Sequence, residues 1–518
     1  MKRLSFALLL AILLVPFSCK NEKEAAPGPA KSIVILHEND VHCTVDGYAR
    51  IAGLRNAIRD TAYVAVVSSG DYLQGGSTGV LSNGSYIMDL QQAVGYDAIT
   101  LGNHEFDYFA PRLFELMEAY KAPVVCANLY DAATGERCFP DYIIKEYGPV
   151  KVAFVGATTP ETEDDEYYAL HDEKGEKIFD LKAEGFYALI QQSVDDARAK
   201  GADYVIVLGH LGEVPTVQKV DSHGLIAATS GIDAVLDGHT HSVVPAEYLA
   251  NKDGKPVLIA QTGTAWENIG MLVIHTDGTL SHALLPVSEI TEEDPKVVAV
   301  LEDIKARMQE VASRGIGDSE VTLTINDANG SRLVRRGETN LGDLLCDAMR
   351  TRMDADIALA NGGGVRADIP AGELTYGDII NAFPFVNYVY KIEATGDDIL
   401  QVIDHCTRKA PLEEDGDFPQ CSGLRYVVHT ADRRISNVVI QRPGGVLEPL
   451  DPEKTYTVAT INYCVNGGGF SHLFEHCTIL EATDTYYRDA VADYITGTLG
   501  GHVGPAYAQP QGRITFVQ

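Results

Sequence analysis

Leu101-Gly102-Asn103-His104-Glu105-Phe106-Asp107 is the stretch that decides the fold of the first half of this chain. It follows a short apolar run and brings an amide, an imidazole and two carboxyl groups together. Carboxylate, amide oxygen and imidazole are ligands of divalent metals. Four further blocks of such residues follow apolar runs typical of buried strands: Asn39-Asp40-Val41-His42, Ser69-Gly70-Asp71, Leu208-Gly209-His210 and Asp237-Gly238-His239-Thr240-His241. Together the five blocks predict a centre of two metal ions, which suits the displacement of a phosphoryl group.

Strand-like and helix-like segments alternate from Ile33 to about Pro286. This alternation predicts a layered α/β domain, in which the loops after the carboxyl ends of the strands carry the site. All five blocks stand at such strand ends. We expect strands at Ile33–Leu36, Tyr63–Val67, Ala98–Leu101, Val152–Val155 and Tyr204–Leu208, and helices at Ser85–Val94 and Ala183–Ala199.

The second half of the chain has a different composition. Glu293–Arg314 has the apolar spacing of a helix, and Gly315 and Gly317 then break the pattern. From Glu320 the segments are β-rich with glycine-rich loops. We therefore predict a catalytic domain over 32–292, a linker helix and hinge over 293–319, and a second domain over 320–518.

The N-terminus has the pattern of an export signal. Lys2 and Arg3 precede an apolar run from Leu4 to Val15, which is too short for an ordinary membrane-spanning helix. Ser18-Cys19 resembles a lipoprotein processing site. We predict a lipoprotein-type signal peptide over 1–19 and a flexible tether over 20–31, which would anchor the chain in the periplasm or outer membrane. The alternative is ordinary secretion with cleavage elsewhere.

The charge balance excludes one class of partner. Lys and Arg number 41 and Asp and Glu 73, which gives a net charge of −32. Binding a nucleic-acid polymer needs a basic face, so no such partner is expected. Small phosphorylated substrates remain compatible, because metals and a few arginines neutralise them locally.

Eight cysteines follow Cys19, and an exported chain can form disulfides. Closeness in sequence suggests the pairs Cys126/Cys138, Cys406/Cys421 and Cys464/Cys477, although sequence does not settle connectivity. The absence of any Cys-x-x-Cys argues against a thiolate zinc site.

The spacing within the blocks favours shared metals. Asp40 and His42 share a face if the strand continues through them, and His239 and His241 have the same spacing. Asp71 can bridge two cations, Asn103 offers a neutral oxygen, and His210 adds an imidazole. Each residue alone has an ordinary structural explanation, such as a turn or a cap, and only the joint pattern favours a metal centre.

His104 and Asp107 add a second layer to the predicted centre. Both follow Asn103 directly, so they are held near the metals. His104 can donate to a phosphoryl or leaving oxygen, and Asp107 can orient its ring and favour the protonated form. The structural alternative is that Asp107 caps a helix over Phe109–Tyr120.

These motifs resemble, in order, those of the bacterial and animal 5′-nucleotidases, a branch of the calcineurin-like metallophosphoesterases. The resemblance runs from about Ile33 to Gln518. It implies a four-layer α-β-β-α catalytic domain and a C-terminal α/β substrate-binding domain. It also implies two divalent ions, for which zinc, manganese and cobalt remain open. One ion would be held by Asp40, His42 and His241 and the other by Asn103, His210 and His239, with Asp71 bridging them and His104 and Asp107 as catalytic dyad.

The resemblance continues through Thr339–Leu344, Asn361–Arg366, Phe383–Asn387 and Asn462–Phe470. It implies that Arg335, Asn361 and Arg366 bind phosphate and ribose, because the arginine fork matches phosphate oxygens. Phe385 and Tyr463 would stack on the base, and Asn387 would bond its edge. The chain departs from the family in two places: Tyr463 stands where phenylalanine is typical, and Gly469 where relatives often carry a ribose-binding aspartate.

Together with the predicted export signal, the resemblance implies an exported, metal-dependent phosphohydrolase that releases phosphate from 5′-nucleotides. The alternatives with the same chemistry are a UDP-sugar pyrophosphatase, a cyclic-nucleotide phosphodiesterase or another phosphomonoesterase. A weaker alternative is a catalytically silent, surface-anchored nucleotide-binding protein. The oligomeric state stays open.

Overall fold

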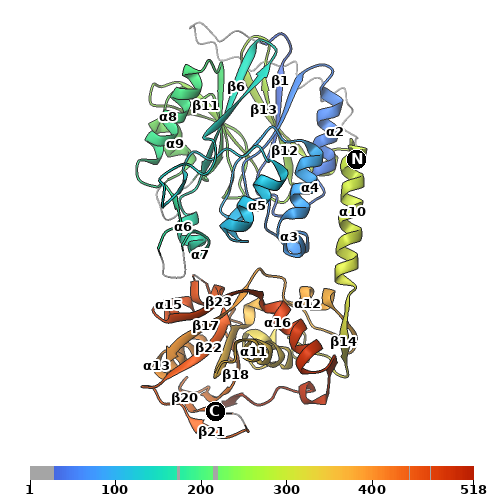
Figure 1. Cartoon of the computed structure of the whole chain (residues 1–518), viewed down its shortest axis with the longest axis vertical. Helices are drawn as coiled ribbons and strands as arrows, with labels where there is room; N and C mark the ends of the chain where they lie inside the picture. The colour runs from blue at the N-terminus through green and yellow to red at the C-terminus, as the bar shows by residue number, and fades with distance from the viewer. Residues whose placement is uncertain (1–28, 172–175, 214–219, 443, 467) are drawn as a thin grey trace. The chain divides into compact units, whose positions relative to one another are not determined.

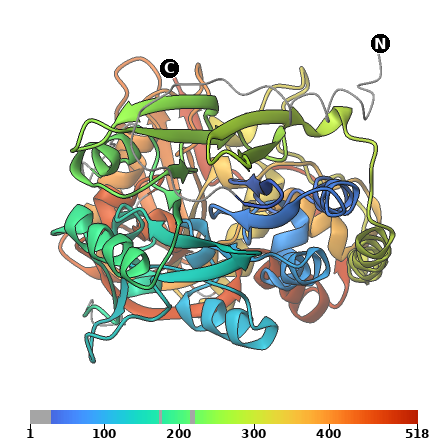
Figure 2. The same cartoon turned by 90° about the horizontal axis from the view of Figure 1, so that it is seen from above.

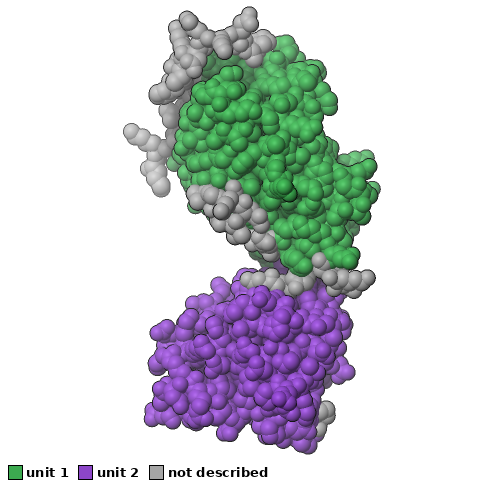
Figure 3. Space-filling model, turned by 90° about the vertical axis from the view of Figure 1, so that its left-hand side faces the viewer, with its two compact units in different colours: residues 1–306 green, residues 307–518 purple. Residues whose placement is uncertain are grey.

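The computed structural model describes residues 29–518 except 172–175, 214–219, 443 and 467. The chain divides into two compact units, residues 1–306 and 307–518 (Figure 3). The division falls inside helix α10 (Pro295–Ala312), which matches the predicted helix within two residues at each end. The predicted signal peptide and residues 20–28 of the tether lie outside the described residues. No helix among the described residues has the length and apolarity that crossing a membrane requires.

Unit 1 is built on two sheets. The first has the order β13-β12-β1-β2-β3 and the second β10-β11-β9-β8-β6-β5. The strands of the first sheet are β1 (Ile33–Glu38), β2 (Tyr63–Ser68), β3 (Ala98–Ile99), β12 (Asn268–Ile274) and β13 (Leu280–Pro286). Those of the second are β5 (Tyr142–Tyr147), β6 (Val150–Thr158), β8 (Tyr204–His210), β9 (Ala234–Leu236), β10 (Val243–Ala250) and β11 (Pro256–Thr262). β4 (Leu129–Asp131) pairs separately with β7 (Phe179–Leu181).

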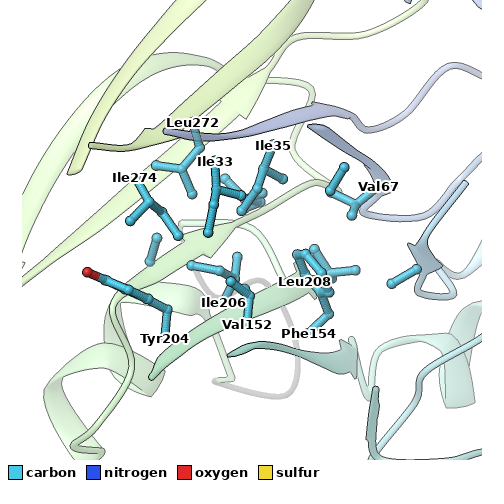
Figure 4. Close-up of a cluster of buried hydrophobic side chains, with 14 of the residues drawn as sticks. Ile33, Ile35, Val67, Val152, Phe154, Tyr204, Ile206, Leu208, Leu272 and Ile274 are labelled. Atoms are coloured by element: carbon cyan, nitrogen blue, oxygen red, sulfur yellow. The ribbon is translucent and has the colours of Figure 1, made fainter. Parts of the chain in front are cut away.

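The two sheets pack face to face through alternate side chains. Ile33 and Ile35 of β1 meet Val152 and Phe154 of β6 in one buried cluster (Figure 4). Successive side chains of a strand point to opposite faces, so Val155, next along β6, belongs to a second cluster beneath a helix. Since both faces of these strands are buried, they read as continuous apolar runs, which is why the sequence located them.

Helices cover the outer face of each sheet. On one side lie α2 (Tyr48–Ile58), α4 (Ser85–Val94) and α5 (Ala110–Tyr120), and on the other α8 (Phe186–Ala199) and α9 (Ser222–Ala228) (Figures 1 and 2). This is the predicted four-layer α-β-β-α arrangement. α4 has the predicted bounds, whereas α8 begins three residues late because Gly185 before it has a φ of 71°. The short helices are α3 (Gly76–Ser82), α6 (Thr162–Asp165) and α7 (Tyr167–Leu170).

Unit 2 is also α/β, with three sheets of orders β18-β15-β22-β17-β23, β21-β20-β19-β25 and β16-β14-β24. Its strands are β14 (Gly315–Ser319), β15 (Ile357–Asn361), β16 (Gly372–Thr375), β17 (Tyr388–Thr395), β18 (Pro419–Ser422), β19 (Leu424–His429), β20 (Ile435–Gln441), β21 (Leu447–Pro449), β22 (Thr455–Ile461), β23 (Thr478–Tyr486), β24 (His502–Val503) and β25 (Ile514–Val517). Its helices are α11 (Asn340–Met353), α12 (Tyr376–Ala382), α13 (Gly396–Cys406), α14 (Tyr463–Asn466), α15 (Ser471–Phe474) and α16 (Tyr487–Asp493).

The sequence predicts mainly β-rich segments in the second half and misses these helices. Residues near the start of several of them nevertheless give a local signal for a helix. Thr375 and Thr395 each form a capping box with the aspartate three residues on, and the Thr339 hydroxyl accepts from Gly342 N at the start of α11. A threonine followed three residues later by an acidic residue is a helix-start signal. The motif that begins at Thr339 is therefore the N-terminus of a buried helix.

The suggested cysteine pairs are wrong, because all eight cysteines of the described chain are free thiols. Their sulfur atoms face other partners. Cys126 Sγ lies 3.4 Å from Thr158 Oγ1, Cys421 Sγ 3.5 Å from Leu424 O, and Cys464 Sγ 3.7 Å from Asn361 Oδ1. Closeness in sequence is therefore no guide to pairing here, since each thiol is held within its own local packing.

Candidate metal centre

The predicted ligands lie at the carboxyl ends of parallel strands. β1 is parallel to β2 and β2 to β3, while β8 is parallel to β9. The loops after these strands therefore leave at the same edge of each sheet. His210 is the last residue of β8, and the other predicted ligands follow β1, β2, β3 and β9.

The expectation that a continuing strand aligns Asp40 with His42 is wrong. β1 ends at Glu38, and φ is 53° at Asp40 and 43° at His42. Left-handed backbone is unfavourable for residues other than glycine and concentrates at functional sites. Three more of the predicted ligands also have a left-handed backbone, with φ of 57° at Asp71, 84° at His239 and 55° at His241.

Hydrogen bonds between loops hold this backbone. Asp40 N donates to Gly70 O and His42 N to Asp71 O, each at 3.0 Å. The fully buried Glu105 carboxylate accepts from four backbone N–H groups: Asp71, Tyr72 and Leu73 after β2, and Gly102 after β3, at 2.6–3.0 Å. Glu105 thereby fixes two ligand-bearing loops against each other.

One group of ligand atoms consists of Asp40, His42, Asp71 and His241, whose ligand atoms all lie within 4.8 Å of one another. His42 Nε2 is 3.0 Å from His241 Nε2, and His241 Nε2 is 3.5 Å from Asp40 Oδ1. At this separation one ring can donate its Nε2 hydrogen to the lone pair of the other ring. Burial lowers the pKa of His42 to about 4, although the Asp71 carboxylate opposes this, so its ring is neutral at pH 7.

A second group adjoins the first through Asp71. Asp71 Oδ2 lies 3.8 Å from His42 Nε2 and 3.2 Å from His210 Nε2, so the carboxylate stands between the two groups. His239 Nδ1 is 3.2 Å from Asn103 Oδ1, and its ring meets that of His210 edge-on at 5.3 Å. The structure thus brings all seven predicted ligand residues together.

These residues fit divalent cations. His210 Nε2 is buried and faces Asp71 Oδ2 at 3.2 Å, while its Nδ1 is held by Ser69 O at 2.7 Å. Burial disfavours a charged ring, yet Asp71 and Asp40 outweigh it and raise the pKa of His210 to about 10. The two buried carboxylates, Asp40 and Asp71, therefore stabilise a positive charge at this site. The donor set of imidazole, carboxylate and amide oxygen suits zinc, manganese or cobalt.

His104 and Asp107 lie beside this centre. His104 Nδ1 is 2.9 Å from Asp107 Oδ1, and His104 N donates to Asp71 Oδ1 at 2.9 Å. Burial opposes protonation of the ring, but Asp71 and Asp107 raise the pKa of His104 well above its ordinary value. The alternative role for Asp107 fails, because Phe109 is the N-cap residue of α5 and no side chain caps that helix.

The predicted substrate-binding residues lie in unit 2. The Arg366 guanidinium stands 5.6 Å from the centre of the Phe385 ring, and Asn361 Nδ2 is 3.4 Å from Gly416 O. Burial, with the charges of Arg332 and Arg366, lowers the pKa of Arg335, so cationic groups gather here. Phe385 and Tyr463 are 42% and 43% exposed, so both rings lie partly at the surface, while Asn387 is buried.

Close backbone approach explains two glycines of the Asn361–Arg366 motif. A Cβ on Gly362 would lie 2.0 Å from Val334 O, and one on Gly363 would lie 2.9 Å from Gly416 O. The glycines therefore permit the loops that carry Arg335, Asn361 and Arg366 to approach one another, rather than merely forming a turn.

Two buried carboxylates of unit 1, Glu105 and Glu161, lie beside the predicted ligands without being predicted from the sequence. Glu105 stands inside the decisive motif, and its role follows only from its hydrogen bonds to the two loops. Glu161, three residues beyond β6, lies 3.0 Å from His239 Nε2. The predicted strand over Val152–Val155 indicates where Glu161 leaves the sheet, but only the parallel pairing of β6 with β8, with Thr158 opposite His210, places that exit beside the predicted ligands.

Comparison with known proteins agrees with this geometry. Residues 33–243 match the calcineurin-like phosphoesterase family, and residues 315–476 match the 5′-nucleotidase C-terminal domain. The chain is 29% identical to a 5′-nucleotidase of Vibrio cholerae, over 86% of each protein. It is 28% identical to the trifunctional nucleotide phosphoesterase YfkN of Bacillus subtilis over 87% of this chain, and spans 33% of the length of that protein. The crystal structure of a Thermus thermophilus 5′-nucleotidase precursor has a TM-score of 0.58 and 25% identity, covering 94% of this chain and 99% of the other.

The layered fold and the ligand-bearing strand exits define the first unit as a calcineurin-like phosphoesterase. The chain therefore combines a calcineurin-like phosphoesterase domain with a 5′-nucleotidase C-terminal domain, and it is similar to 5′-nucleotidases over most of its length.

Proposed function

We propose that this chain releases phosphate from 5′-nucleotides with the help of two divalent metal ions. The observation that carries the proposal is the position of Asp71, whose Oδ2 faces His42 Nε2 at 3.8 Å and His210 Nε2 at 3.2 Å. A carboxylate between two sets of donors suits a bridge between two cations. Asp40, His42 and His241 would hold one ion, and Asn103, His210 and His239 the other.

When bound, such ions supply an activated water and neutralise charge on the phosphate. The protein groups beside them have separate tasks. A protonated His104 donates a hydrogen bond to a phosphoryl or leaving oxygen, where negative charge develops. Asp107, 2.9 Å from its Nδ1, fixes the ring and stabilises the imidazolium.

Unit 2 supplies recognition of the nucleoside in this proposal. Arg335 and Arg366 bind phosphate oxygens, and Asn361 binds the ribose. The exposed rings of Phe385 and Tyr463 stack on the base, with Asn387 at its edge. The domain bounds 32–292, 293–319 and 320–518, and a hinge within the middle segment, stay part of the proposal.

Gly469 favours a wider substrate range as a second candidate function. Its φ is 56°, and a Cβ there would meet Tyr463 Cε1 at 3.4 Å, so the position is suited to glycine and carries no carboxylate for a ribose hydroxyl. UDP-sugars, cyclic nucleotides and other phosphomonoesters are therefore included as substrates to be tested. A relative is named a trifunctional nucleotide phosphoesterase, which agrees with breadth in this family.

The proposed location is outside the cytoplasm. Lys2, Arg3 and the apolar run to Val15 support export, and Ser18-Cys19 supports a lipid anchor. Replacing Cys19 by serine and following the protein between the membrane and soluble fractions of the producing bacterium tests the anchor.

Phosphate release from AMP by the full chain, supplied with manganese or zinc, tests the activity. Asp71→Asn removes the proposed bridge and should abolish release, while Asp60→Asn, an exposed residue after α2, serves as the matched control. Release by the control and not by the Asp71 variant supports the proposal. If AMP stays intact with wild-type protein while UDP-sugars or cyclic nucleotides are cleaved, the monophosphate assignment is wrong. If none is cleaved, the silent nucleotide-binding alternative replaces it.

A further inference from the structure

Glu161 occupies a position that the proposed metal centre does not yet explain. It lies in the loop that follows β6, and its side chain is only 7% exposed. β6 lies directly beside β8, with Thr158 paired to His210, so this loop emerges beside a predicted ligand. The chain thus brings a sixth strand exit to the centre, and its carboxylate points at one of the histidines.

The contact between Glu161 and His239 is specific in its atoms. Glu161 Oε2 lies 3.0 Å from His239 Nε2, whereas His239 Nδ1 lies 3.2 Å from Asn103 Oδ1. The two nitrogens of the ring therefore face different partners. Nδ1 faces the predicted ligand Asn103, and Nε2 faces the carboxylate.

We propose that Glu161 is a positioning residue that holds His239 with Nδ1 directed at the metal. The inference rests on the proposed role of His239 as a ligand. A carboxylate only accepts a hydrogen bond, so the hydrogen of the neutral ring sits on Nε2 and the lone pair on Nδ1. Metal-bound histidines generally donate their other N–H to such a partner, which fixes the ring and makes it a better donor.

The backbone supports the same assignment. His239 has a φ of 84° and its N–H donates to both oxygens of Asp40, at 3.2 and 3.0 Å. The main chain is therefore fixed, and the remaining freedom is rotation of the imidazole. Asn103 and Glu161 bracket the ring from its two nitrogens, so loss of Glu161 releases this rotation.

Metal binding by the full chain without substrate provides the test, using manganese and zinc alone as probes. Glu161→Gln should weaken one of the two metal equivalents about 10–100-fold and leave the other unchanged, because only one group of ligands includes His239. Activity should return at high metal concentration with an unchanged KM for AMP. Glu163→Gln is the matched control, because that residue lies on the same segment but pairs with Lys177 at 2.9 Å.

Two results would overturn the assignment. Wild-type affinity for both equivalents in Glu161→Gln means that the contact does no positioning. Loss of one equivalent at every metal concentration makes Glu161 a ligand instead. If Glu161→Gln does not fold, Glu161→Asp, which keeps the charge but shortens the reach, is measured under the same two criteria.

A His239→Ala background separates this inference from the proposed function. There Glu161→Gln should have no further effect on metal affinity, since the ring that it positions is gone. If His239→Ala binds both equivalents like wild type, the proposed ligand set itself is wrong. If His239→Ala loses one equivalent and Glu161→Gln loses nothing, only the role of Glu161 fails.

Discussion

Asp71 joins the candidate metal centre to the dyad, because its Oδ1 accepts from the backbone N–H of His104 at 2.9 Å while its Oδ2 faces the imidazoles of His42 and His210. One carboxylate thereby sets the distance between the metal ligands and the residue that would contact the phosphoryl group. The backbone of Asp71 is itself held by Glu105 at 2.8 Å.

Removing the imidazole of His104 should lower kcat without removing metal. A group that donates to developing charge contributes about 10²–10⁴-fold, so His104→Ala is expected to lose that much in AMP hydrolysis. Asp107→Asn should lose less, because the ring stays present but loses its charged partner. Metal content by elemental analysis is the control readout. A His104 variant that loses its metals would place the residue among the ligands instead.

Glu105→Gln should destabilise unit 1. Four backbone N–H groups converge on this fully buried carboxylate, and an amide replaces one acceptor oxygen by a donor. Burial and the Asp71 charge raise the pKa of Glu105 to about 7, so the comparison belongs above about pH 8, where the carboxylate is ionised. Hydrogen bonds to charged groups contribute about 1.5–3 kcal/mol each, so the loss of two should reduce the free energy of unfolding there by about 3 kcal/mol or more. Denaturant unfolding measures this, with the exposed Glu118→Gln on α5 as the control. Equal stability of both variants would show that the four contacts contribute little.

How far the sequence predicts this architecture depends on whether a feature is local. Buried strands are continuous apolar runs, so their ends, and the ligand residues that follow them, could be located. The left-handed backbone of Asp40 and His42 could not be predicted, because such backbone is usually indicated by a glycine and neither position has one. Glu161 was missed for a related reason: its place beside His239 follows from the pairing of β6 with β8, which joins residues about fifty positions apart. Cysteine pairing failed because closeness in sequence does not fix the direction of a thiol.

A histidine pair between β1 and β13, with one ring fully buried and the other half-buried, should make unit 1 sensitive to acid. His37 on β1 is fully buried, and its Nε2 lies 2.7 Å from His282 Nε2 on β13. Burial lowers the pKa of His282 to about 4, against the hydrogen bond to Pro245 O, and burial also lowers that of His37. Both rings are neutral in the folded state, whereas an unfolded histidine titrates near 6.5. The folded state therefore binds fewer protons, and stability should fall as pH drops from 6.5 toward 4.

For His282 alone this loss is at most on the order of 3 kcal/mol, from about 1.4 kcal/mol for each unit between the ordinary pKa of 6.5 and about 4. Denaturant midpoints measured across that pH range check it. His282→Gln should flatten the pH dependence in this window, and His429→Gln on β19 of unit 2 serves as the control. An unchanged slope in His282→Gln would assign the acid sensitivity to other groups.

The exposed rings of Phe385 and Tyr463 should determine the KM for nucleotides. Stacking of a base on an aromatic ring is worth about 1–3 kcal/mol, so Phe385→Ala or Tyr463→Ala is expected to raise KM for AMP by roughly 5–150-fold. Tyr463→Phe keeps the face and should leave KM close to wild type, which separates stacking from the hydroxyl. Neither ring belongs to unit 1, so metal content should not change. A phosphate ester without an aromatic ring, such as ribose 5-phosphate, should be hydrolysed equally by all these variants, and a parallel loss on it would refute the stacking role.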